Sequence, residues 1–182
     1  MHNEMRSKLQ NIATDAGAAG AGVVSVDQIV FRREFRAACA QNICGKYGAC
    51  WMCPPDVGEI DDMIAQAKRY TYILVFQSIH PLEDSFDIEG MQEGAIKHNA
   101  LIQTLAEQLE DILKNPLKLG AGACHVCPSC SKAEHVPCPY PKRATASLEA
   151  YGIHVGELAT LSGLSYINGL NTVTYFGGFL FS

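Results

Sequence analysis

Residues 70–79 read Tyr70-Thr71-Tyr72-Ile73-Leu74-Val75-Phe76-Gln77-Ser78-Ile79. Most of these residues are β-branched or aromatic, and neither glycine nor proline interrupts them, so this segment is the clearest strand prediction in the chain. Its apolar run, residues 70–76, is far shorter than the roughly 20 residues that a membrane-spanning helix needs. The sequence therefore predicts a buried strand here and no membrane span.

Helical and extended patterns alternate on both sides of this strand. Further strands are expected at residues 23–26, 117–123 and 172–181. Helices are expected at residues 5–16, from an N-cap at Asp56 to Ala67, and at residues 90–114, 141–150 and 155–161. About four strands separated by helices indicate an α/β, or α+β, layered fold, whose strand order the sequence does not give.

The length and composition fit one globular domain. The chain has 182 residues, of which 48% are hydrophobic, and this is enough for one core. No low-complexity linker and no shift in composition divides it, so residues 1–182 are expected to form a single domain. The formal net charge of −5 argues against a nucleic-acid partner.

All eight cysteines fall into two short segments. The first quartet is Cys39, Cys44, Cys50 and Cys53, and the second is Cys124, Cys127, Cys130 and Cys138. Packing alone would not group them, so each quartet is expected to gather sulfurs around a metal or metal cluster. A disulfide scaffold is the rival interpretation, but it is typical of secreted domains below about 80 residues, and residues 1–10 contain no apolar signal segment. We therefore expect reduced thiols in a cytoplasmic protein.

The second quartet has the stronger chemical signature. Cys124, Cys127 and Cys130 have the CxxCxxC spacing with which bacterial ferredoxins present three thiolates to a cubane cluster. Cys138 follows after seven residues and precedes a proline, whereas the fourth ferredoxin cysteine follows after three and often ligates the other cluster. The spacing predicts a [4Fe–4S] site, and it permits ligation across the two quartets without indicating it.

Zinc is the competing metal for both quartets. Structural zinc sites usually consist of two CxxC pairs, and the first quartet contains one such pair, Cys50 and Cys53. Iron–sulfur ligation is therefore favoured over zinc, more strongly at the second quartet. His125 and His135 are either alternative ligands or ordinary loop histidines. Trp51 is expected to shield a cluster from water or to pack its loop.

Positive charge is concentrated beside the cysteines. Residues 32–53 and 124–143 together carry +5, so the rest of the chain carries −10. An anionic thiolate site gains from nearby positive charge, although a solvated basic face would show the same pattern. Each quartet also ends in Cys-Pro before an expected helix, whose N-terminal N–H groups would favour an anionic cluster.

No local motif identifies a reaction. The chain has no GxGxxG after a strand, no Walker loop and no GxSxG. In the last expected strand, Gly177-Gly178 indicates either a bulge or a close approach of backbone or ligand. The sequence leaves open whether the protein is an enzyme, such as a component of an oxidoreductase.

Four ordered motifs span most of the chain. They are Cys44–Gly48 with Trp51–Pro55, Cys124–Cys130 with Cys138, Ser147–Ile153, and Asn171–Gly177. Together they resemble the predicted metal-binding protein family of bacteria and archaea called domain of unknown function 2284. The resemblance implies metal binding and, from the distribution of the family, a place in anaerobic metabolism.

Three functional hypotheses follow. The favoured one is a cytoplasmic protein with two [4Fe–4S] clusters, one per quartet, that serves in electron transfer or as a redox accessory to an anaerobic enzyme and meets a redox partner protein. The second is a zinc-stabilised structural or interaction module without redox chemistry. The third is an iron–sulfur enzyme in which one cluster keeps an open iron site, so that one quartet supplies only three ligands.

Overall fold

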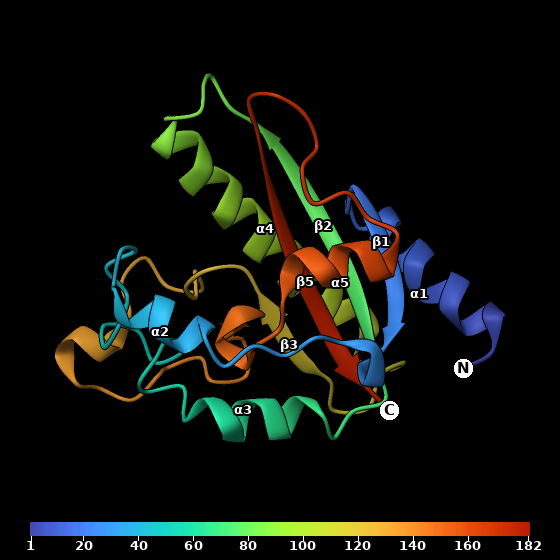
Figure 1. Ribbon diagram of the computed structural model, residues 1–182, viewed down its shortest axis with the longest axis horizontal. Coiled ribbons are helices and arrows are strands. Elements are labelled where there is room, and N and C mark those ends of the chain that lie inside the picture. The colour runs from blue at the N-terminus through green and yellow to red at the C-terminus, as the bar shows by residue number, and fades with distance from the viewer.

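The protein is described over all residues, 1–182, by a computed structural model. One five-stranded sheet has the order β1-β2-β5-β3-β4, and five α-helices surround it (Figure 1). The strands are β1 (Gly20–Ser25), β2 (Tyr72–Pro81), β3 (Leu117–Gly120), β4 (Ala146–Ser147) and β5 (Thr172–Phe181). The helices are α1 (Asn3–Asp15), α2 (Phe35–Ala40), α3 (Ile60–Ala67), α4 (Ile88–Leu109) and α5 (Val155–Ser162). The expected mixed α/β fold is confirmed, and neighbouring strands are antiparallel except β3 and β4.

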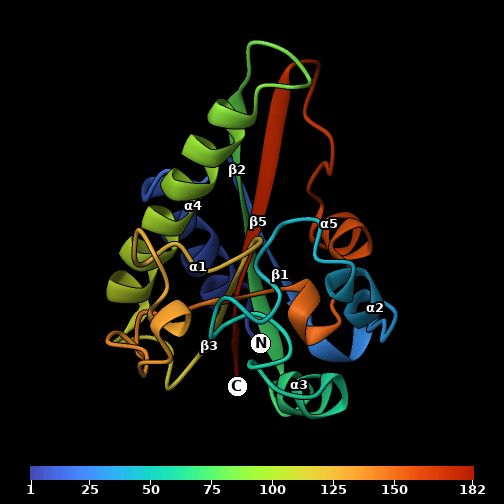
Figure 2. The same cartoon turned by 90° about the vertical axis from the view of Figure 1, so that its left-hand side faces the viewer.

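Helices cover both faces of the sheet. Figure 2 shows α1 and α4 on one side of it and α2 and α5 on the other. Alternate residues of β2 enter the two cores, with Ile73 and Val75 on the α5 side and Leu74 and Phe76 on the α4 side. All four are fully buried, which explains why this strand is a continuous apolar run. None of the helices combines the length and apolar character needed to cross a membrane.

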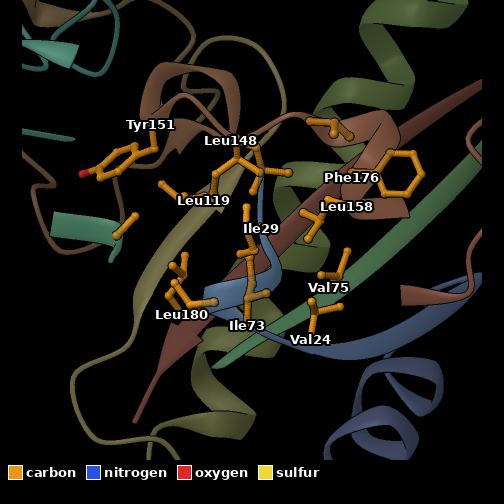
Figure 3. Close-up of a cluster of buried hydrophobic side chains, with 14 of the residues drawn as sticks. Val24, Ile29, Ile73, Val75, Leu119, Leu148, Tyr151, Leu158, Phe176 and Leu180 are labelled. Atoms are coloured by element: carbon orange, nitrogen blue, oxygen red, sulfur yellow. The ribbon is translucent and has the colours of Figure 1, made fainter. Parts of the chain in front are cut away.

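The core on the α5 side reaches from the middle of the sheet to the cysteine segments. Figure 3 shows Ile73 and Leu180 of the central strands below Leu148 and Tyr151. A short 3-10 helix, η3 (Glu149–Tyr151), follows β4. Leu148 immediately precedes this helix, and Tyr151 is its last residue. This core therefore holds in place the β4–η3 segment, which contributes to the candidate site described below.

Gly177 and Gly178 lie in a regular part of β5. They pair with Phe76 and Val75 in a continuous register, so there is no bulge. A Cβ atom on Gly177 would lie 2.5 Å from Cζ of the buried Phe76 ring, and one on Gly178 would lie 2.7 Å from Cδ1 of Ile73. The close approach expected at this pair is therefore made by the protein's own core.

The prediction of a helix at residues 141–150 is wrong. Residues 141–145 form a turn and an extended segment, β4 follows, and η3 comes next. The sheet stabilises the extended form, because β4 pairs with β3 and the Leu148 N–H donates to the Gly120 carbonyl at 3.0 Å. The second cysteine segment therefore leads into a strand, and no helix N-terminus follows it.

Two details of the first cysteine segment also differ from expectation. α3 begins at Ile60 with Glu59 as N-cap, so Asp56 is not the cap and the helix starts seven residues after Cys53. α2, which the sequence did not predict, lies within the segment and carries Cys39. Only the first segment leads into a helix, and that helix begins at a distance from the cysteines.

Helix α4 carries a buried histidine. His98 is 2% exposed, stacks on Phe76 and has its Nδ1 2.8 Å from Oγ of Ser78. The same hydroxyl lies 2.9 Å from Nε2 of His80. Burial lowers the pKa of His98 to about 4. His98 is therefore neutral in the folded protein at neutral pH.

The lowered pKa of His98 predicts that the folded protein loses stability in mild acid. The unfolded chain binds the His98 proton near pH 6.5 and the folded chain near pH 4, so between these values the unfolded state holds more protons and stability falls as pH falls. At pH 5 the loss from His98 is about 2 kcal/mol. Urea unfolding at pH 7 and pH 5 measures it, with His98→Gln as the comparison. The variant should lose less stability than the wild type between the two pH values, and equal losses would contradict the prediction.

Candidate metal centre

The two cysteine segments meet at one end of the molecule. The first runs from α2 to Cys53, and the second connects β3 to β4. Figure 1 shows both segments to the left of the sheet, and all eight cysteines are free thiols. Since β3 and β4 are parallel, their carboxyl ends lie side by side beneath these segments.

Three contacts fasten the two segments to each other. The Trp51 indole N–H donates to the Val136 carbonyl at 2.9 Å. Nζ of Lys132 lies 4.2 Å from the centre of the same indole ring and forms an ion pair with Asp56. Both charged side chains are mostly buried, and the cation over an indole face is a favourable arrangement. The two segments therefore form one structural unit.

This contact gives a prediction for Trp51. Trp51→Ala removes the hydrogen bond, the cation–π contact and part of a cavity wall, and should lower the free energy of unfolding by about 2 kcal/mol. Trp51→Phe keeps one aromatic ring but loses the N–H donor and the second ring, so it should cost about 1 kcal/mol. Urea unfolding of both variants measures the difference. Equal stability of Trp51→Ala and the wild type would mean that the indole does not join the segments.

Three cysteines of the first quartet line a cavity of about 80 Å³, the first cavity. They are Cys39, Cys44 and Cys53. Met52, Ser147 and Ala150 also line it, so the end of β4 and the middle of η3 form part of its wall.

Five cysteines line a small neighbouring cavity of about 20 Å³, the second cavity. They are Cys50, Cys124, Cys127, Cys130 and Cys138. Trp51, Met52 and Ala144 contribute to its wall. Met52 lines both cavities, which therefore share a wall. The whole second quartet is brought together as expected, whereas Cys50 of the first quartet faces the second cavity.

Cys50 and Cys53 form a coupled pair of buried thiols. A hydrogen bond from Cys53 lowers the pKa of Cys50 to about 5, against the raising effect of burial. The backbone N–H groups of Met52 and Cys124 and the thiol of Cys130 also lower it. The pKa of Cys53 is raised because Cys53 donates to Cys50 and is itself buried. Cys50 is thus the thiolate of the pair; it lines the second cavity and contacts Cys53, which lines the first.

Burial and nearby groups have opposite effects on the pKa values of two other thiols. Burial raises the pKa of Cys124, while the backbone N–H groups of Thr145 and Val126 lower it by donating to the sulfur. Burial likewise raises the pKa of Cys39, and the positive charge of Arg36 opposes this rise. Backbone N–H groups directed at sulfur stabilise the thiolate form, which is the form that binds metal.

Arg36 is the basic residue with the most unusual surroundings. Its Nε and Nη2 atoms are buried and have no hydrogen-bond partner in the chain. It lies on α2 three residues before Cys39, so the two side chains share a helix face. A buried guanidinium without a partner is costly, so an anion from outside the chain is expected to complete it.

The two histidines of the second segment line neither cavity. His125 is half-buried, and burial lowers its pKa. His135 is exposed and ends the short helix η2 (Ser131–Glu134) with a φ of 55°. No group of three or more His, Cys, Asp or Glu side chains lies close enough together to hold a single metal ion.

Several cavity residues were not recognised as such from the sequence. Ser147 and Ala150 were assigned to a helix, although they belong to one of the four motifs, Ser147–Ile153. The basic character of Arg36 was apparent, but its burial depends on tertiary packing and has no sequence signal. Met52 lies between two cysteines of the first quartet, and only the structure shows that it separates two cavities.

The comparison with known proteins agrees with this concentration of thiols. A family described as "Predicted metal-binding protein (DUF2284)" matches residues 22–181, which include all eight cysteines and both cavities. No curated protein and no solved structure is similar enough to the chain to be matched with it. With nearly its whole length matched, the chain belongs to the DUF2284 family of predicted metal-binding proteins.

Proposed function

We propose that the protein binds two [4Fe–4S] clusters, one in each cavity, and serves in electron transfer or as a redox accessory in anaerobic metabolism. The observation that carries the proposal is that all eight thiols line two cavities that share Met52 as a wall. Cysteine thiolates are the usual ligands of such clusters, and the CxxCxxC spacing is the one that ferredoxins use.

The donor set and its surroundings fit these clusters. Cys124, Cys127, Cys130 and Cys138 would hold the cluster of the second cavity, and Cys39, Cys44 and Cys53 would hold that of the first. Backbone N–H groups donate to the sulfurs of Cys50 and Cys124, a type of hydrogen bond that tunes cluster potentials. The unpartnered guanidinium of Arg36 near Cys39 would face a negatively charged group.

The shape of the two sites favours clusters over zinc. Four thiolates around one zinc ion at about 2.3 Å lie about 3.8 Å from each other, so they converge on a point. Here no group of three or more potential ligands lies close enough together to hold a single ion, although three and five thiols line the two cavities. A cluster of several atoms suits such an arrangement better than a single ion does.

The protein residues would govern how a cluster exchanges electrons. When bound, a [4Fe–4S] cluster supplies one-electron redox chemistry. Trp51 and Met52 line the second cavity, and Met52 also lines the first. Ile43, Val136 and Tyr140 are exposed apolar residues on the two cysteine segments. We infer that a redox partner protein approaches there, where the clusters are nearest to the surface.

The proposal also includes a cytoplasmic location. Eight free thiols in metal-ligand spacing are stable in a reducing compartment, whereas an oxidising one would convert them to disulfides.

Reduction of the anaerobically purified protein tests the redox function. We expect a brown protein whose broad visible absorption bleaches on addition of dithionite and whose reduced form gives an EPR signal, because cubane clusters accept one electron each. A brown protein that dithionite leaves unchanged would contradict the role in electron transfer. A colourless protein that unfolds on removal of zinc would instead identify a zinc-stabilised module.

A further inference from the structure

Three of the eight cysteines line the first cavity and five line the second, whereas the sequence predicts four at each site. The first cavity is lined by Cys39, Cys44 and Cys53, and Cys50 lines the second. The N–H of Cys124 and the thiol of Cys130, both in the second segment, lie within hydrogen-bonding reach of the Cys50 sulfur. Cys50 also contacts Cys53, which places it between the two groups of thiols.

The second cavity has a complete ligand set without Cys50. Cys124, Cys127, Cys130 and Cys138 supply four thiolates, one for each iron of a cubane. The first cavity has only three thiols, so one iron of a cubane bound there would need a different ligand. Its wall includes the Ser147 hydroxyl, but this group already accepts a hydrogen bond from the Ala150 N–H at 3.0 Å.

Arg36 indicates the chemistry of the missing ligand. The two unpartnered atoms, Nε and Nη2, lie on the same edge of the guanidinium, the edge that binds a carboxylate through two parallel hydrogen bonds. No acidic side chain of the chain forms an ion pair with it, although Arg32 and Arg33 are each paired. Arg36 does not line the first cavity itself, but it is one helical turn from Cys39 and its positive charge acts on that thiol, so its guanidinium can hold an anion beside the first group of thiols.

We propose that the cluster of the first cavity is bound by only three cysteines, Cys39, Cys44 and Cys53, and that its fourth iron binds a carboxylate ligand held by Arg36. This inference rests on the proposed function, because it requires a cluster in that cavity. It makes the first site a ligand-binding site and leaves the second cluster fully ligated by cysteine for electron transfer.

Iron counting on a chain with a disabled second site tests the cysteine assignment. Cys127→Ala with Cys138→Ala should leave only the first cluster, with about four irons per chain after anaerobic reconstitution. Adding Cys50→Ser to this background should leave the iron unchanged, whereas adding Cys44→Ser, the matched control, should remove it. Loss of iron with Cys50→Ser to the same extent as with Cys44→Ser would overturn the assignment.

Oxidation of the full chain gives a second measurement that does not depend on the disabled background. A [4Fe–4S]²⁺ cluster with one iron not held by cysteine releases that iron as Fe²⁺ and gives one electron to ferricyanide, which leaves a [3Fe–4S]⁺ cluster with its own EPR signal. We expect about one such spin per chain in the wild type and in Cys50→Ser, and none in Cys44→Ser. A wild type that holds about eight irons but gives no three-iron signal would overturn the inference. A wild type without iron would defeat the proposed function itself.

Acetate titration tests the ligand. The EPR spectrum of the reduced protein should change saturably with sodium acetate and remain unchanged with sodium chloride at the same ionic strength. Arg36→Met should raise the half-saturating acetate concentration about tenfold or more, because it removes two charge-assisted hydrogen bonds. Arg33→Met, which removes an exposed arginine paired with Asp61, is the control and should bind acetate like the wild type. No response to acetate in the wild type, or an equal response in Arg36→Met, would overturn the carboxylate site.

Discussion

Replacing Cys127 and Cys138 together by alanine is expected to remove about four of the eight irons that the chain is proposed to bind. Both residues line only the second cavity, so the double variant keeps two of its four proposed ligands there and should lose that cluster while the first stays in place. Iron and acid-labile sulfide, measured per chain after anaerobic reconstitution, should both fall by half. The visible absorbance per chain should fall in the same proportion.

Ser129→Ala is the matched control for this variant. Ser129 is exposed and lies within the same motif, between Cys127 and Cys130, yet it lines neither cavity. It should bind as much iron as the wild type. If the double variant also retains all of its iron, these two cysteines are not ligands and the ferredoxin-like interpretation of the second segment is wrong.

Replacing Gly177 by valine is expected to destabilise the fold by about 3 kcal/mol or more. Even the Cβ atom would lie 2.5 Å from the ring of Phe76, which is fully buried at the centre of the α4-side core and has no room to move away. The new side chain would therefore force β2 and β5 apart. Urea unfolding measures the loss, and a variant with wild-type stability would show that the two strands do not pack as described.

A second substitution separates this clash from other effects of a strand glycine. Phe76→Leu shortens the side chain that the new atoms would meet, so it should be less harmful in the Gly177→Val background than in the wild type. A favourable interaction free energy of about 1 kcal/mol or more is expected from the double-mutant cycle. Additive effects would mean that valine destabilises the strand for a reason unrelated to Phe76.

The strands could be predicted from the sequence because their signals are local. β2 is a long uninterrupted run of strand-forming residues, and the structure buries it on both faces. β5 was also found, although its central position between β2 and β3 depends on pairings distant in sequence. Hydrophobic pattern identifies an element, but it does not select the element's neighbours.

Residues 141–150 show where local signals mislead. Pro141 suits the first position of a helix, and the small and apolar residues that follow are compatible with one. The backbone groups of β4 instead pair with β3, more than twenty residues earlier in the chain, and a two-residue strand has almost no sequence pattern of its own. The helix N-terminus expected after the second quartet is therefore absent. Cys124 instead accepts hydrogen bonds from the backbone N–H groups of Thr145 and Val126.

The cysteines were apparent from their spacing as candidate ligands, but their grouping around the cavities was not. Cys50 and Cys53 are three residues apart, and nothing in this spacing separates them. The turn between them, closed by a 3.0 Å hydrogen bond from the Cys53 N–H to the Cys50 carbonyl, lets the two sulfurs contribute to different cavities. The direction of each side chain depends on the fold beneath it, including the ends of β3 and β4.

The most direct test of the two-cluster proposal is the metal and sulfide content of the anaerobically purified protein. About eight irons and eight acid-labile sulfides per chain, with little zinc, are the predicted result. Stoichiometric zinc without acid-labile sulfide would contradict it.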